Sequence, residues 1–277
     1  MTATQVILKN KNIFLNMIVD CFPFYNELGM LKYRLETLSP VVDKFVLVES
    51  PRTFRGNPKK LYYQENKHLF EKYSDKIVHV IDNNLVENPG NPWMNDAHQR
   101  NYVQEGLYQL RLGPNDVVLL SDADEIFDPE VIRNIEEHLV GPTPFVSLDM
   151  DLYYYNIETK LELPWPAPKA ARYSYFRGVY PHAFRNGSTG KVVPNAGWHL
   201  SYFGNPKMII NKLKNFAHNE FSEVYSYDDE ARVSEVVQQG RDLVGRDIKF
   251  VKVPVESNPR LPPRYTEITT IVDTYDR

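Results

Sequence analysis

The chain has 277 residues, of which 42% are hydrophobic, 25% charged and 13% aromatic. This composition is typical of a globular protein and excludes disordered, collagen-like and low-complexity chains. The formal net charge is −4, which argues against non-specific nucleic-acid binding because that activity needs a basic face.

The chain contains one cysteine, Cys21, so an intramolecular disulfide and zinc clusters of several cysteines are excluded. No apolar run reaches the roughly 18 residues that a membrane-spanning helix needs. Residues 1–11 lack the long apolar stretch of a secretory signal. We therefore expect a cytoplasmic protein without a membrane span.

In the first half, short apolar runs alternate with helical patterns. The runs predict buried strands at 13–20, 45–49, 77–81 and 117–120. Apolar residues recur at helical spacing over 27–38, 66–73 and 95–110. Asp128 followed by Pro129 predicts the start of a further helix. This alternation predicts an α/β fold with a mostly parallel twisted sheet flanked by helices.

After residue 140 the chain becomes rich in aromatic residues. A long strand is expected at 145–155, and strands with a turn at Asn186 and Gly187 are expected at 173–184 and 191–202. Helices are expected after Asn205 and at 227–239, followed by a proline-rich extended tail. Neither a repeat nor a flexible linker is visible, so we expect one continuous domain over residues 1–277.

Asp122 and Asp124 directly follow the run at 117–120. Two carboxylates two residues apart on an extended chain project to the same side, and ligands of parallel sheets bind beyond the carboxyl ends of the strands. Carboxylates suit a hard cation that offsets the charge of a diphosphate. The same spacing recurs at Asp149 and Asp151 inside an aromatic strand, so position, not pattern, selects the first pair.

Seven segments in the same order resemble glycosyltransferase family 17, which includes N-acetylglucosaminyltransferases. They are 20–27 (DCFPFYNE), 41–50 (VVDKFVLVES), 52–54 (RTF), 56–59 (GNPK), 99–101 (QRN), 120–126 (LSDADEI) and 197–199 (GWH). The resemblance spans residues 13–220. It implies a GT-A fold with a nucleotide-binding half at 1–140 and an acceptor half at 141–277. It also implies Mn²⁺ or Mg²⁺, a UDP-sugar donor such as UDP-N-acetylglucosamine, a glycan or glycoconjugate acceptor, and inversion at the anomeric carbon.

For the metal, the resemblance implies Asp122, Asp124 and His199, although a single histidine is more often a core or surface group. Further expected contacts to the nucleotide sugar are Asp20, Glu49, Arg52, Arg100 and Asp122. Lys214 and His218 share a helical face that suits a phosphate, and the alternative is a solvated face. Arg100 offers a bidentate fork to a diphosphate, and its alternative is a surface salt bridge.

A carboxylate is expected to deprotonate the acceptor hydroxyl as general base. The sequence leaves four candidates, Glu220, Asp151, Glu158 and Asp229, of which the first two are favoured. Aromatic faces stack on sugar rings. The acceptor-side candidates are Tyr153, Tyr154, Tyr155, Trp165 and Trp198, with core packing as the alternative.

Three other functions compete. A phosphatase with an Asp-x-Asp motif places the pair on its first strand, whereas here it follows the fourth. A nucleotidyltransferase on a similar fold needs a glycine-rich basic loop near the first strand, and none is visible over 20–31. A carbohydrate-binding module would explain the aromatic residues but not the carboxylate pair.

Overall fold

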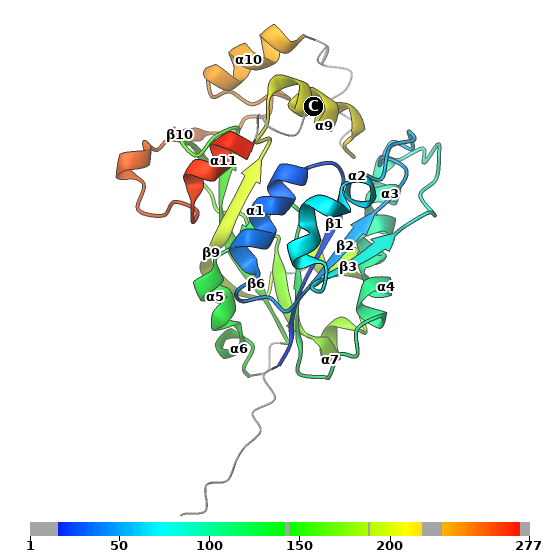
Figure 1. Ribbon diagram of the computed structural model, residues 1–277. Coiled ribbons are helices and arrows are strands. Elements are labelled where there is room, and N and C mark those ends of the chain that lie inside the picture. The colour runs from blue at the N-terminus through cyan, green and yellow to red at the C-terminus, as the bar shows by residue number, and fades with distance from the viewer. Residues whose placement is uncertain (1–15, 142–143, 188, 218–228, 272–277) are drawn as a thin grey trace, which may run out of the picture.

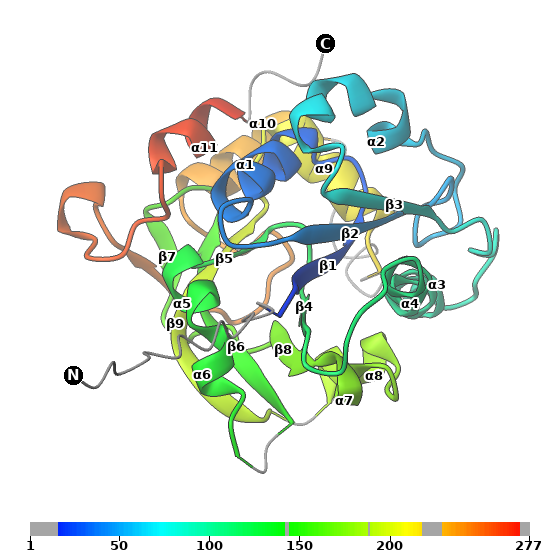
Figure 2. The same cartoon turned by 60° about the horizontal axis from the view of Figure 1, so that its bottom comes forward.

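The computed structural model describes residues 16–141, 144–187, 189–217 and 229–271. Within these ranges, strands form one mixed, twisted sheet with helices on both faces (Figures 1 and 2). Four parallel strands form one side of the sheet in the order β4–β1–β2–β3. They are β1 Ile18–Phe24, β2 Lys44–Glu49, β3 Ile77–Ile81 and β4 Val117–Leu120.

The other strands extend the sheet beyond β4. From there β8, β6, β7 and β10 follow in antiparallel pairing, while β9 lies parallel to β6 and pairs with the short β5. Their bounds are β5 Glu125–Phe127, β6 Phe145–Tyr154, β7 Thr159–Leu161, β8 Lys169–Arg172, β9 Lys191–Ser201 and β10 Phe250–Lys252.

The helices lie on both faces and at the carboxyl ends of the parallel strands (Figure 1). Their bounds are α1 Leu28–Leu38, α2 Tyr62–Glu65, η1 Lys67–Tyr73, α3 Pro92–Asn101, α4 Val103–Tyr108, α5 Pro129–Arg133, α6 Ile135–His138, α7 Tyr173–Phe176, α8 Pro181–Asn186, α9 Pro206–Asn215, α10 Glu230–Gln238, η2 Val255–Ser257 and α11 Tyr265–Ile271. Among the described helices, none is both long enough and apolar enough to cross a bilayer.

Three of the parallel strands, β1, β2 and β4, are buried on both faces, whereas β3 at the edge of the sheet is only partly buried. Phe22 of β1 shares one apolar cluster with Leu31 of α1, while Cys21 shares a second cluster with Leu107 of α4. Strands covered on both sides read as nearly continuous apolar runs, which is why β2 and β4 are visible in the sequence. The predicted α/β class, with a mostly parallel sheet flanked by helices, is confirmed.

The first strand begins later than expected. The sequence pattern placed it at 13–20, but β1 covers Ile18–Phe24, and residues 13–15 lie outside the described ranges. Its register pairs Val19 with Lys44 and Phe24 with Glu49. Asp20 ends an apolar run in the sequence, but in the structure it lies inside the strand. It is buried and forms an ion pair with Arg34, which is also buried.

The strand expected at 173–184 is wrong, because this segment forms α7 and α8. Pro181 occupies the first turn of α8, where its fixed φ and missing N–H suit a helix, and Gly187 follows the helix as its C-cap instead of forming a hairpin turn. The strands β5 and β8 were not expected. Their three and four residues become strands only through pairing with neighbours.

Other elements follow the expected pattern with smaller differences. The helix expected at 95–110 is divided at Tyr102 into α3 and α4. The helix expected at 227–239 is described from Glu230, with Asp229 as its N-cap, and residues 227–228 lie outside the described ranges. The expected extended tail includes β10, η2 and α11.

Candidate active site

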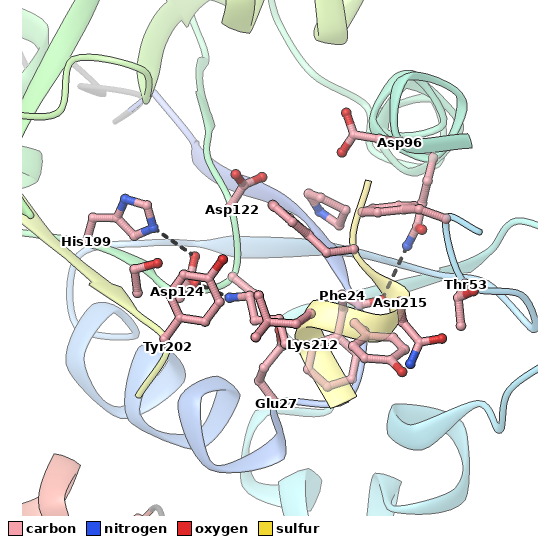
Figure 3. A pocket seen from close by; sticks show the side chains of 18 of the residues that line it. Phe24, Glu27, Thr53, Asp96, Asp122, Asp124, His199, Tyr202, Lys212 and Asn215 are labelled. Atoms are coloured by element: carbon pink, nitrogen blue, oxygen red, sulfur yellow. Dashed lines mark hydrogen bonds and ion pairs between the residues drawn. The ribbon is translucent and has the colours of Figure 1, made fainter. Parts of the chain in front are cut away.

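A cavity of about 220 Å³ lies at the carboxyl ends of the parallel strands (Figure 3). Its walls come from the segment after β1, the segment after β2, α3, the β4–β5 turn, β6, β9 and α9. The acidic and basic side chains on these walls are Glu27, Arg52, Lys59, Asp96, Arg100, Asp122, Asp124, His199, Lys212 and Arg246. The cavity therefore joins the carboxylate pair to several cations.

Asp122 lies between two arginines. Arg100 of α3 forms an ion pair with its Oδ1, and Arg185 of α8 donates to its Oδ2 at 2.7 Å. Burial by itself would raise the pKa of Asp122, but the two guanidinium groups hold it well below its usual value. Arg100 also donates to Asp96 at 2.9 Å, so it is fixed by two carboxylates.

Asp124 faces a lysine and a histidine. The Nζ of Lys212, on α9, lies 2.7 Å from Asp124 Oδ2, and the Nε2 of His199, on β9, lies 3.5 Å from Oδ1 (Figure 3). Burial opposes ionisation of Asp124, but Lys212 and His199 outweigh it and lower its pKa. The structure thus places side by side two of the three residues expected to bind a metal, Asp124 and His199.

The pairing of β5 with β9 brings His199 to this position. Glu125 lies opposite His199, and Phe127 lies opposite Gly197. Gly197 is required at this crossing, because a Cβ there would lie 2.2 Å from the carbonyl oxygen of Ile126. The segment 197–199 therefore has a packing role besides the histidine.

Glu125 is a buried carboxylate that was not among the residues expected at the site. Its side chain is fully buried, accepts from Arg185 at 2.6 Å and from the backbone N–H of Asp122 at 2.6 Å, and also accepts from the indole N–H of Trp165. These hydrogen bonds fix the conformation of the β4–β5 turn. The feature of the sequence that could have indicated Glu125 is its position directly after the Asp-x-Asp pair.

Asp20 lies beneath the site and does not line the cavity. Both its oxygens accept from Arg34, at 2.7 and 2.6 Å, and its side chain is fully buried. Arg34 in turn donates to the carbonyl oxygens of Asp122 and Glu125 at 3.0 and 2.7 Å. The expected contact of Asp20 with a nucleotide is incompatible with this burial, and the residue supports the β4–β5 turn through Arg34.

Glu49 is likewise buried away from the cavity. It accepts from the backbone N–H of Tyr63 at 3.0 Å and lies 3.2 Å from His79. Its position does not support the expected nucleotide contact, because its oxygens hold the start of α2. Arg52 does line the cavity, and its guanidinium donates to the carbonyl oxygen of Gly56 at 2.9 Å.

The α9 residue expected to face a phosphate is corrected by the structure. Lys214 is exposed and does not line the cavity, whereas Lys212, two residues earlier, does. Two residues on a helix differ by about 200° in direction, so a stripe through Lys214 points elsewhere. His218 and Glu220 lie outside the described residues.

The remaining candidates for a general base lie away from the cavity. Asp151 on β6 pairs with Lys160 at 2.6 Å and lies 3.6 Å from Arg260. Glu158 is exposed in the β6–β7 turn. The side chain of Asp229 caps α10 by accepting from two backbone N–H groups of its first turn. Their positions favour structural roles over proton transfer at this site.

Two of the five aromatic candidates line the cavity, namely Tyr154 and Trp165. Tyr153, Tyr155 and Trp198 are buried in apolar clusters, as the packing alternative predicted. Five further aromatic residues, which the sequence pattern did not indicate, also line the cavity: Phe24, Tyr25, Phe54, Tyr202 and Phe216.

The side chains present fit a divalent cation in part. Oδ1 of Asp124 and Nε2 of His199 are 3.5 Å apart, a separation that one ion with bonds of about 2.1 Å can bridge. Carboxylate and imidazole are also a suitable donor set for a first-row metal. Asp122 does not join them, because each of its oxygens is held by an arginine. Across the described residues, no cluster of three such ligands is arranged around one point.

The amino-acid sequence was compared with known families and proteins. The model of glycosyltransferase family 17 matches residues 8–247. β-1,4-Mannosyl-glycoprotein 4-β-N-acetylglucosaminyltransferases from Rattus norvegicus and Homo sapiens are each 25% identical over 246 residues, covering 76% of this chain and 45% of the relative. The chain thus spans less than half the length of these relatives.

Two solved structures are similar at a low level. One is a 4-diphosphocytidyl-2C-methyl-D-erythritol synthase from Anaerococcus prevotii, with 16% identity, a TM-score of 0.38, and coverage of 65% of this chain and 89% of that one. The other is glucosyl-3-phosphoglycerate synthase from Mycobacterium tuberculosis in complex with Mn²⁺, UDP and phosphoglyceric acid, with 11% identity, a TM-score of 0.37, and 87% coverage of both chains. Likeness at these scores carries no argument about the site. The family model, by contrast, matches most of the sequence, and the chain belongs to glycosyltransferase family 17.

Proposed function

We propose that the chain transfers N-acetylglucosamine from UDP-N-acetylglucosamine to a hydroxyl group of a glycan acceptor, with inversion at the anomeric carbon. The observation that carries this proposal is the position of Asp122 and Asp124. They lie at the carboxyl end of β4 in the wall of a cavity that also presents Arg52, Arg100 and Lys212. Membership of a glycosyltransferase family supports the reaction class.

The cations of the cavity are suited to the diphosphate of the donor. Arg100 forms ion pairs with Asp96 of α3 and Asp122 of the β4–β5 turn. Lys212 forms an ion pair with Asp124 of the same turn. The N–H groups of both cations are therefore oriented before a ligand binds. Charge-assisted hydrogen bonds to phosphate are strong because both partners are ionised. As the bond to the leaving UDP breaks, these donors stabilise the negative charge that develops on it.

A divalent cation, Mn²⁺ or Mg²⁺, would be held by Asp124 and His199 and would offset further charge of the diphosphate. Small divalent cations are commonly bound by one or two carboxylates together with phosphate oxygens of the substrate. Asp122 contributes by orienting Arg100. Cytoplasmic location and a single domain stay predictions from the sequence.

The proposal is tested by calorimetric titration with UDP and UDP-N-acetylglucosamine, in Mn²⁺ and in EDTA. For Asp124→Asn we expect metal-dependent UDP affinity to fall at least tenfold, since a charged ligand of the cation is lost. The matched control is Asp149→Asn, which alters the second Asp-x-Asp pair on β6, outside the cavity. Equal UDP affinity in both variants, or no UDP binding by the unaltered chain, would contradict the proposal.

The competing functions are separated by product analysis. A transferase releases UDP from UDP-N-acetylglucosamine and attaches the sugar to an acceptor or to water. A phosphatase releases inorganic phosphate, and a nucleotidyltransferase consumes UTP and releases pyrophosphate. A binding module releases none of these products.

A further inference from the structure

A second cavity of about 400 Å³ adjoins the first, between α1 and α9. Four residues line both cavities: Glu27, Asp124, Tyr202 and Lys212. In Figure 3 these four labelled side chains lie next to one another along one side of the first cavity. The Asp124–Lys212 ion pair, 2.7 Å across, therefore stands in the wall between the two spaces.

The lining of the second cavity combines flat apolar groups with amides. Tyr62, Tyr202 and Phe203 are the aromatic residues of the lining, and Asn26 and Asn211 are its amide residues. Such a mixture suits a sugar ring, whose axial C–H groups pack on aromatic faces while its hydroxyl groups exchange hydrogen bonds with amides. Asn211 is already oriented, because its Oδ1 accepts from the hydroxyl of Tyr25 at 2.7 Å.

Glu27 differs from the other carboxylates of the first cavity. Asp96, Asp122 and Asp124 each lie within ion-pair distance of an arginine, lysine or histidine. Within the described ranges Glu27 forms no ion pair, and its Oε2 accepts only from the backbone N–H of Asn26 at 3.1 Å. Lys59 and Lys212 interact with Glu27 electrostatically, but beyond ion-pair distance. A carboxylate oxygen that is not held in an ion pair is available to accept the proton of a bound hydroxyl group.

We propose that the second cavity binds the acceptor sugar and that Glu27, at its boundary with the donor cavity, accepts the proton of the attacking hydroxyl. This proposal rests on the transferase function proposed above. The O–H bond of the acceptor breaks and its proton passes to the Glu27 carboxylate. The acceptor oxygen forms a bond to the anomeric carbon, and the bond from that carbon to the diphosphate breaks with its electron pair leaving on UDP.

The arrangement suits a single displacement. An inverting attack requires the nucleophile and the leaving group on opposite sides of the anomeric carbon. The two cavities adjoin at the four residues that they share, one of which is Glu27. A donor in the first cavity and an acceptor in the second would therefore meet next to Glu27 from two sides. Holding the two reactants in this orientation before the bond forms increases the rate of the reaction.

The first test fills the second cavity. Met208 on α9 lines only this cavity, so Met208→Trp reduces its volume and leaves the donor side chains in place. Met94→Trp, at a side chain that is 61% exposed on α3, is the matched control. Rates are measured with UDP-N-acetylglucosamine and a panel of mannose-, galactose- and N-acetylglucosamine-terminated oligosaccharides. Hydrolysis of the donor without acceptor and calorimetric affinity for UDP are measured in parallel.

For Met208→Trp we expect KM for the acceptor to rise at least tenfold, with UDP affinity and donor hydrolysis within twofold of the unaltered chain. An unchanged acceptor KM would overturn the assignment of the cavity. If the chain hydrolyses the donor but transfers nothing to any sugar of the panel, the proposal that the second cavity binds a sugar would be wrong. Failure of the unaltered chain to bind UDP or consume the donor would instead refute the proposed function itself.

The second test addresses proton transfer. Glu27→Gln keeps the shape of the side chain but removes its basicity. We expect kcat for transfer to fall at least a hundredfold, with UDP affinity and acceptor KM within threefold of the unaltered chain. The control is Glu36→Gln on α1, the helix that begins after Glu27; it lies outside both cavities and should retain kcat. A kcat for Glu27→Gln within threefold of the unaltered chain would overturn the role of Glu27, and equal melting temperatures exclude unfolding as the cause of a loss.

Discussion

Arg185 donates to Asp122 at 2.7 Å, although 63 residues separate the two in the sequence. The same guanidinium lies 2.6 Å from Glu125, so one cation from α8 joins two carboxylates of the β4–β5 turn. Burial lowers the pKa of Arg185, but the two carboxylates outweigh this and raise it. The orientation of Asp122 thus depends on a helix that the sequence pattern placed in a strand.

Arg185→Met should destabilise the chain strongly. Two carboxylates would lose their shared cation, and Glu125 would stay buried without it. Removing one partner of a buried ion pair costs about 3–5 kcal/mol, so the free energy of unfolding in urea at pH 7 should fall by this amount. Arg133→Met, which breaks an exposed pair with Glu130, should cost less than about 1 kcal/mol. Similar losses in both variants would contradict the role assigned to Arg185.

Lys212→Met should weaken UDP binding, whereas Lys214→Met should not. The first substitution removes a cation from the cavity and leaves Asp124 with one fewer positive neighbour. A hydrogen bond to a charged group contributes about 1.5–3 kcal/mol, so we expect the Kd for UDP to rise at least tenfold. Lys214 is exposed outside the cavity. Calorimetry on both variants decides the point, and a larger effect of Lys214→Met would reverse the assignment.

The affinity for UDP should fall as the pH rises through 8. Lys59 lines the cavity, and burial lowers its pKa to about 8, against the opposing effect of Glu49 and Glu27. Above this pH its ammonium group loses the charge that attracts a phosphate. Lys59→Arg keeps its charge over pH 7–9.5 because a guanidinium does not titrate there. The decrease should therefore be present in the unaltered chain and absent in Lys59→Arg, and parallel pH profiles would refute the role of Lys59.

The same lysine sets a pH dependence of stability. Its pKa in the folded chain, about 8, is below the value of 10.5 for an ordinary lysine. Between these values the unfolded chain binds more protons than the folded chain, so the contribution of Lys59 to the free energy of unfolding rises with pH in this window. The contribution should be seen as a difference in slope between the unaltered chain and Lys59→Met.

Gly197→Ala should lower both stability and activity. Its added Cβ would lie 2.2 Å from the carbonyl oxygen of Ile126, so β5 and β9 must separate and His199 must move. Overpacking of this kind costs about 1–3 kcal/mol, measurable by chemical denaturation. Gly113→Ala is a suitable comparison, because its Cβ would meet its nearest neighbour, Asp116, at an ordinary 3.7 Å. Equal stability of the two variants would show that the β5–β9 crossing tolerates a side chain.

Local patterns predicted part of the fold well and part poorly. The strands at 44–49 and 117–120 were visible because burial on both faces makes them continuous apolar runs. The strand at 77–81 lies at the edge of the sheet and is only partly buried, but its residues are still mostly apolar. Segments such as 169–172 and 173–184 lack a decisive pattern of their own. Strand β8 forms because β4 and β6 pair with its two edges, and α7 and α8 form where aromatic side chains pack on the sheet.

The sequence by itself determined the α/β class, the family and the place of Asp122 and Asp124 after a buried strand, because these follow from local periodicity and ordered motifs. Only the tertiary structure decided which cations face the two carboxylates. Arg185 and Lys212 reach them across 63 and 88 residues. Such contacts depend on how helices cross the sheet, and no periodicity within one segment records that geometry.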